Sequence, residues 1–240
     1  MKIAEIYAIL DEIAPFADAE NWDNSGLQIG EMQSEFDQIY VALDVDSDMI
    51  LNIAPNSLLI THHPLIFGGL RSLNFAKFPA SIVRNLVQKN ISLISMHTNF
   101  DKHCLNHFVA SKILGYEIYD EREFLVFMRV NFSFEALCKD IKSKLNLDFL
   151  RAVKAQNQIK NIALCTGSGM DLSKNLDVDC FLTGDIKYHD ALSNLENGVS
   201  LIDIGHFESE RYFGDCLRDF LQKKQIAVIM AHSKNPFNYY

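Results

Sequence analysis

The chain has 240 residues, of which 48% are hydrophobic and 22% are charged, a balance typical of a folded globular protein and not of a disordered or fibrous one. Its formal net charge of −9 argues against an extended nucleic-acid surface, which needs clustered Lys and Arg, but allows a local basic pocket for one nucleotide. Asp, Asn or Ser interrupt the longest apolar stretches, so we expect no membrane-spanning helix.

In chain order, residues 1–14 place apolar side chains at helical spacing with acidic residues between them, which predicts an amphipathic helix and not a cationic signal peptide. Runs rich in Val, Ile and Leu then predict buried strands at 39–43, 57–60, 91–96, 162–165, 180–182, 200–202 and 226–230. Helical periodicity is found at 78–88, 105–114, 134–145, 186–195 and 209–223. Segments 124–129 and 148–153 could add strands at an antiparallel edge or in an α+β lobe. Strands that alternate with helices predict an α/β fold.

Two lobes are expected, the first over residues 1–125 and the second over residues 126–240. No Gly/Pro/Ser-rich linker separates them, so we expect them to pack together. The five cysteines are scattered and never form a Cys-x-x-Cys pair, which argues against a disulfide framework and against a thiolate zinc site. This cysteine usage suits a protein of the reducing cytoplasm.

The strongest local signal is Thr61-His62-His63-Pro64, which follows an apolar strand directly. A loop just past a strand can bend two neighbouring histidines toward one metal ion or toward two adjacent ions. The carboxyl end of a strand is also where α/β folds place their ligands. Taken alone, the pair could equally be surface or capping histidines.

Two further clusters follow apolar strands. The first ends in Asp101, which could bridge two cations, and contains His97, which could be a ligand or could orient one. The second contains His206 and Glu210, whose spacing of four places both side chains on one face of a helix. Taken alone, this second cluster could be an acidic helix start that the helix dipole favours.

Together, the three strand ends supply three histidines and two carboxylates before His97 is counted. This number exceeds the need of one zinc ion. Imidazole and carboxylate ligands without thiolate suit Zn, Mn, Fe or Co, and a bridging carboxylate suits a pair of ions about 3.5–4 Å apart.

The order of these motifs resembles that of the GTP cyclohydrolase 1 type 2 homologs, also called the Nif-three-like dinuclear-metal proteins. The resemblance covers nearly the whole chain and is carried by residues 22–28, 61–65, 97–101, 182–185 and 205–211. It implies two interlocked α/β lobes, a dinuclear metal site in the cleft between them, and a ring-shaped homohexamer. By motif position it implies the metal ligands His62, His63, Asp101, His206 and Glu210. Two departures are the sequence Lys102–Asn106, where relatives have small residues and a glycine, and Asp46, where relatives often have Thr.

The resemblance also names a substrate. The leading hypothesis is a metal-dependent hydrolase that opens the guanine ring of GTP at C8, releases formate and yields dihydroneopterin triphosphate. The candidate acids and bases are His97, His189 and Glu208. The candidate triphosphate ligands are Arg71, Lys187 and Arg211, although each is also typical of a solvated surface charge.

Two alternatives remain open. The same ligands could serve a phosphatase or another nucleotide hydrolase, because the metal chemistry is generic. They could also serve a non-enzymatic protein that binds metal or docks a partner. Open coordination positions favour a site that holds water or substrate over a sealed structural one.

Overall fold

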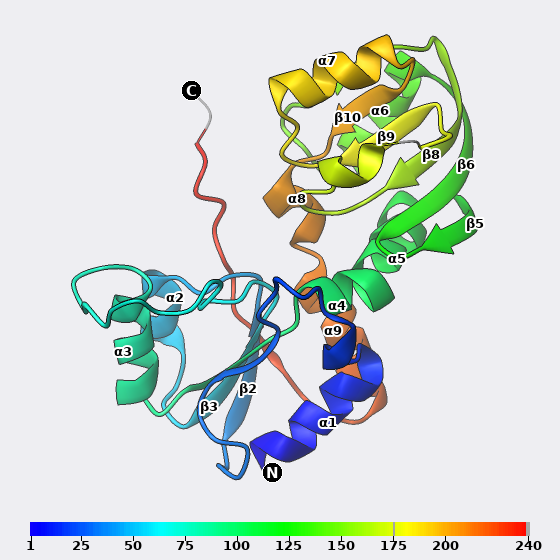
Figure 1. Ribbon diagram of the computed structural model, residues 1–240. Helices are drawn as coiled ribbons and strands as arrows, with labels where there is room; N and C mark the ends of the chain where they lie inside the picture. The colour runs from blue at the N-terminus through cyan, green and yellow to red at the C-terminus, as the bar shows by residue number, and fades with distance from the viewer. Residues whose placement is uncertain (175, 239–240) are drawn as a thin grey trace. The chain divides into compact units, whose positions relative to one another are not determined.

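The computed structural model describes residues 1–174 and 176–238. The chain forms two compact units, of which unit 1 comprises Met1–His103 and Phe213–Tyr240, and unit 2 comprises Cys104–Tyr212. This division differs from the expected boundary at residue 125. Residues 104–125 belong to unit 2, and the carboxyl-terminal segment returns to unit 1 because α9 (Phe213–Lys223) and β11 (Ile229–Met230) complete that unit (Figure 1).

Unit 1 is built on a five-stranded sheet with the order β1-β4-β3-β2-β11. Its strands are β1 (Gly26–Ile29), β2 (Gln38–Ala42), β3 (Ser57–Thr61), β4 (Ser92–Ser95) and β11. The first strand is antiparallel to its neighbour, and the other four are parallel. Every residue of β3 and β4 is buried, as expected for central parallel strands covered on both faces.

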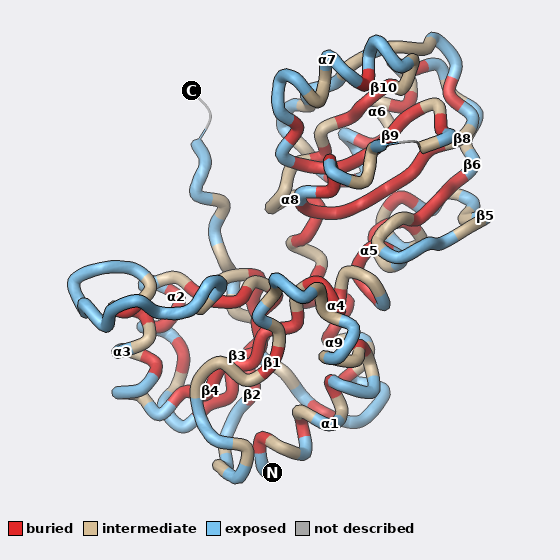
Figure 2. The backbone as a smooth tube through the Cα atoms, in the orientation of Figure 1, coloured by how far each residue is buried: buried red, intermediate tan, exposed pale blue. Residues whose placement is uncertain are grey.

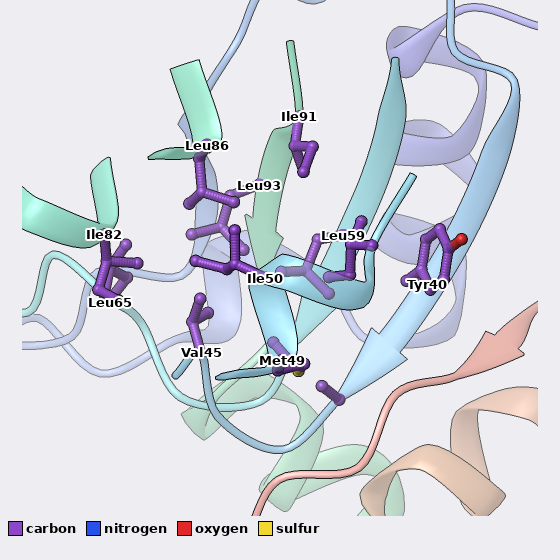
Figure 3. Packing of buried hydrophobic residues seen from close by; sticks show 12 residues of the cluster. Tyr40, Val45, Met49, Ile50, Leu59, Leu65, Ile82, Leu86, Ile91 and Leu93 are labelled. Carbon is purple, nitrogen blue, oxygen red and sulfur yellow. The ribbon is translucent and has the colours of Figure 1, made fainter. Parts of the chain in front are cut away.

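The helices of unit 1 pack apolar side chains into its core. They are α1 (Ile3–Ile13), α2 (Ser47–Asn52), α3 (Ala80–Gln88), the short α4 (Thr98–Phe100) and α9, with a 3₁₀ turn at Phe16–Asp18. Ile82 and Leu86, one turn apart on α3, pack with Ile50 of α2 and with Leu59 and Leu93 of the sheet (Figure 3). The core of this unit is therefore a helix-on-sheet layer.

Asp46 starts α2 by accepting a hydrogen bond from the backbone N–H of Met49 at 2.7 Å. Asp and Thr are both favoured at this capping position. An Asp at this position therefore supplies the same start to the helix as a Thr would.

Unit 2 has a six-stranded sheet with the order β5-β6-β8-β9-β10-β7. Its strands are β5 (Glu117–Arg122), β6 (Leu125–Ser133), β7 (Arg151–Val153), β8 (Gln158–Leu164), β9 (Cys180–Thr183) and β10 (Ser200–Asp203). The strands β8, β9 and β10 are parallel, and the remaining pairs are antiparallel. The register aligns Phe127, Ala163, Phe181, Leu201 and Val153 in one row across the sheet, and the buried members of this row belong to the core of the unit.

The helices of unit 2 include α6 (Phe134–Lys144), α7 (Tyr188–Glu196) and α8 (His206–Glu210), with a 3₁₀ turn at Met170–Ser173. The chain is helical from Thr98 to Leu114, through α4, π-helical turns at Asp101–Leu105 and Val109–Leu114, and α5 (Asn106–Phe108). Figure 2 shows buried backbone concentrated in the strands and exposed backbone on the outer faces of the helices. No helix within the described part of the chain is long and apolar enough to cross a bilayer.

The α/β fold class is confirmed, and the elements that differ from expectation have local reasons. The helix expected at 209–223 is divided into α8 and α9, because the helix is interrupted at Arg211 and Tyr212, where the chain passes from unit 2 to unit 1. The strand expected at 226–230 shrinks to Ile229–Met230. The strand β5 was not expected, because an exposed edge strand with a polar sequence lacks the apolar run that marks a buried one. The segments 124–129 and 148–153 do contribute strands, at β6 and β7.

Candidate metal centre

Three histidines of unit 1 converge at the carboxyl ends of two paired parallel strands. Thr61 of β3 is opposite Ser95 of β4, so the residues that follow both strands emerge at the same sheet edge. Here the ring centroids of His62, His63 and His97 lie 5.0–5.5 Å apart. One ligand atom from each ring lies within 4.8 Å of the others, so these residues could hold a metal ion.

An acceptor holds Nδ1 of each of these rings. Nδ1 of His62 lies 2.8 Å from the carbonyl oxygen of Met96. Nδ1 of His63 lies 2.7 Å from Oδ1 of Asp44, and Nδ1 of His97 lies 2.8 Å from Oδ1 of Asp23. Because carbonyl and carboxylate oxygens only accept, each ring carries a proton on Nδ1 and, when neutral, has its lone pair on Nε2. Metal-binding histidines are typically oriented in this way.

Asp101 supplies the carboxylate of this group. It begins a π-helical turn, a local widening of the helix that is frequent at functional sites. Its Oδ1 lies 3.4 Å from Nε2 of the fully buried His62. Two ligands that bind one zinc ion tetrahedrally at ordinary bond lengths lie about 3.3 Å apart, so this separation fits joint coordination. The ring of Phe213 packs on the His62 ring at 5.0 Å and covers that side of it.

Asp23 is a carboxylate of this region that several hydrogen bonds hold in place. It accepts hydrogen bonds from His97, from the backbone N–H and hydroxyl of Thr98, and from the hydroxyl of Ser25. Burial disfavours its charged form, but the hydrogen bonds from His97, Thr98 and Ser25 outweigh burial and hold the pKa of Asp23 below its usual range. Asp23 therefore stays ionised and fixes the orientation of His97.

Unit 2 provides an imidazole and a carboxylate from α8. The turn spacing of the helix places Nε2 of His206 at 3.0 Å from Oε2 of the buried Glu210. Nδ1 of the same ring lies 2.6 Å from Oδ2 of Asp185, in the loop after β9. Burial opposes the charge on the ring, but Glu210 and Asp185 outweigh it and raise the pKa of His206 to about 9. A divalent cation that binds Nε2 would take the place of that proton, so the donor pair fits a metal ion.

The loop after β8 packs against the carboxylate of Glu210. Gly167 has φ +63°, and a Cβ at this position would lie 2.0 Å from Oε1 of Glu210. The Gly167 N–H donates to the hydroxyl of Ser209, and its carbonyl accepts from the N–H of Gly184 at 2.7 Å. Only glycine therefore leaves room for the carboxylate in its observed position.

The other candidate residues are spread over both units. Arg71 is exposed in the loop 66–79 of unit 1, and Lys187 and His189 are exposed at the start of α7. Glu208 lies over the backbone of Gly205, where a Cβ would meet its Oε2 at 2.1 Å. Arg211 donates through one Nη to the carbonyl of Leu145 at 2.7 Å.

The sequence did not indicate the carboxylates that orient the histidines. Asp44 and His63 are 19 residues apart, Asp185 and His206 are 21 apart, and Asp23 and His97 are 74 apart. The available signal was position, because Asp44 and Asp185 each follow a strand within two residues. Pairing them with particular histidines required the register of the sheets.

The fold and these side chains define a mixed α/β protein with imidazole–carboxylate groups suited to divalent metal. Its sequence matches the family Duf34/NIF3 (NGG1p interacting factor 3) over residues 1–236, and the chain belongs to this family. It is 50% identical to a GTP cyclohydrolase 1 type 2 homolog from Campylobacter jejuni, with full coverage of both chains. It is 41% identical to a GTP cyclohydrolase 1 type 2 from Helicobacter pylori, over 98% of this chain and 97% of that one.

Solved structures share the fold. A hypothetical protein from Staphylococcus aureus superposes with a TM-score of 0.86 at 30% identity, over 100% of this chain and 99% of that one. The resemblance noted from the motifs is therefore confirmed at the level of the family and the fold.

Proposed function

We propose that the protein is a divalent-metal-dependent hydrolase that opens the guanine ring of GTP at C8, releases formate and yields dihydroneopterin triphosphate. The observation that carries the proposal is that three imidazoles of unit 1 and one of unit 2 are each held at Nδ1 by an acceptor, and that each unit places a carboxylate beside an Nε2 atom. The names of the Helicobacter pylori and Campylobacter jejuni relatives supply the substrate.

The proposed ligands of two ions are His62, His63, Asp101, His206 and Glu210. When bound, the ions would supply Lewis acidity and activate water as a nucleophile. Zn, Mn, Fe and Co all suit these donors.

The remaining roles belong to the chain itself. His97 is held by the ionised Asp23, so it could accept a proton at Nε2 and return it during ring opening. Glu208 and His189 are the further proposed acid–base groups. We propose Arg71, Lys187 and Arg211 as ligands of the triphosphate, where Arg211 would use the guanidinium N–H groups that do not bind Leu145.

The test is formate release from GTP by protein reconstituted separately with Zn, Mn, Fe and Co. We expect metal-dependent formate that is lost in His63→Ala and kept in His107→Ala. The second variant removes a half-exposed histidine that pairs with Glu121 and is not one of the proposed ligands. A fully metallated protein that releases no formate would contradict the reaction. Hydrolysis of a model phosphodiester by the same sample would then move the function to another metal-dependent hydrolysis.

The assembly and location form a second part of the proposal. We propose a ring-shaped homohexamer that works in the cytoplasm, on the basis of the family resemblance and of the free cysteines Cys104, Cys138, Cys165, Cys180 and Cys216. Mass photometry of the purified chain tests the hexamer, and a monomer or dimer at working concentration would contradict it.

A further inference from the structure

Two exposed aromatic rings stand beside His97 in unit 1. Trp22 is 58% exposed and Phe67 is 52% exposed, and their centroids are 5.8 Å apart with an interplanar angle of 45°. The His97 ring lies 6.1 Å from Trp22 and 6.2 Å from Phe67, edge-on to both. Two large apolar rings that stay in water next to a metal-ligand group are typical of a surface that binds a ligand.

Hydrogen bonds join the two segments that carry these rings. The side chain of Asn24 donates to the carbonyl of Ile66, and the N–H of Ile66 donates to Oε1 of Gln28 at 2.9 Å. The Gln28 amide closes the set by donating to the carbonyl of Asn24 at 2.7 Å. Trp22 directly precedes Asp23, and Phe67 directly follows Ile66 of this network. The backbones of both aromatic residues are therefore fixed before any ligand binds.

The motif at residues 22–28 is then explained almost residue by residue. Asp23 holds His97, and the hydroxyl of Ser25 accepts from the His97 N–H at 3.1 Å. Asn24 and Gln28 tie the motif to the loop that follows His63. Among the described residues, Trp22 makes no hydrogen bond within this framework, which leaves its exposed ring as its contribution.

We propose that Trp22 and Phe67 form an aromatic clamp, meaning two neighbouring rings whose exposed faces stack on the purine base of the nucleotide beside His97. The inference rests on the proposed function for the identity of the base. A planar heteroaromatic ring stacks on aromatic faces, and fixed rings bind it with little loss of conformational entropy. The clamp gives the site a preference for nucleotides over simple phosphate esters.

Trp22 is the sole tryptophan of the chain, so intrinsic fluorescence reports directly on the clamp. Metal-free and zinc-loaded protein would be titrated with GTP, with guanosine and with inorganic tripolyphosphate. We expect quenching by GTP and by guanosine but not by tripolyphosphate. The variant Phe67→Ala should weaken guanosine binding about tenfold, and Phe67→Tyr should restore it. Phe75→Ala is the matched control, because Phe75 is a 45% exposed aromatic of the same loop whose ring faces Arg84.

The clamp would be overturned by equal quenching by tripolyphosphate, by the absence of base-dependent quenching in both protein forms, or by unchanged guanosine affinity in Phe67→Ala. If Phe67→Ala keeps the quenching but changes the oligomeric state by mass photometry, the two rings belong to a contact between copies, and the clamp is also overturned.

The test of the clamp can fail independently of the test of the proposed reaction. Base-dependent quenching without formate release would refute the reaction and leave the clamp. Formate release with the same KM for GTP in Phe67→Ala as in the wild type would refute the clamp and leave the reaction.

Discussion

Replacing Gly167 with alanine should weaken metal binding through the position of Glu210. The Gly167→Ala Cβ would lie 2.0 Å from Oε1 and 2.9 Å from Cδ of Glu210, whereas ordinary contacts between heavy atoms are about 3.5 Å. The backbone cannot yield easily, because the N–H and carbonyl of Gly167 are both hydrogen-bonded. The carboxylate must therefore move by about 1 Å or more, and we expect metal affinity to fall about 10–100-fold, as for other losses of ligand orientation.

Backbone strain has to be separated from this displacement. A non-glycine residue in the left-handed region costs about 1–2 kcal/mol. Gly198 has φ +78° and no atom within 4 Å of a built Cβ, so Gly198→Ala carries the same strain without touching Glu210.

Calorimetric titration of zinc into both metal-free variants, with thermal melts in chelator, measures the two effects. We expect both variants to lose stability and only Gly167→Ala to lose metal affinity. Equal zinc affinity and stoichiometry in the two variants would refute the assignment of Glu210 as a ligand positioned by Gly167.

The other predictions concern metal orientation, pH and the core. Asp44→Ala removes the acceptor of the His63 ring, so zinc affinity by calorimetry should fall about 10–100-fold with the proposed ligand itself intact. Leu59→Ala in the fully buried core of unit 1 should lower the free energy of unfolding by about 2–5 kcal/mol in urea titrations; a loss below 1 kcal/mol would contradict close packing there. Burial works against ionisation of Asp140, but the hydrogen bond from Tyr116 helps to outweigh burial and lowers the Asp140 pKa. The ionised Asp140 therefore stabilises the folded state above the pKa of about 4 that Asp has in the unfolded chain, and this contribution is lost as pH falls through the lower pKa of the folded state. Tyr116→Phe should therefore cost at most about 1 kcal/mol at neutral pH, because Asp140 is partly solvated, and the difference from wild type should shrink in acid; a pH-independent difference would contradict this account.

Much of the fold was predictable from local pattern. The all-buried strand Ser57–Thr61 and the helix Phe134–Lys144 were identified because continuous apolar runs and helical periodicity survive in the sequence. The edge strand Glu117–Arg122 was missed because exposed polar residues carry no such pattern. The boundary between the two compact units falls inside the helical stretch from Thr98 to Leu114, where no linker composition marks it in the sequence.

The sequence by itself determined the candidate ligands of the site. Histidine and carboxylate side chains that follow apolar strands indicate metal chemistry by residue type and position alone, as at His62 and Asp101. The tertiary structure decided how those ligands are held. The pairing of His63 with Asp44, of His97 with Asp23 and of His206 with Asp185 depends on sheet register and on contacts across 19–74 residues. The same holds for Gly167 against Glu210, because a short-range pattern carries no information about which distant backbone will approach a side chain.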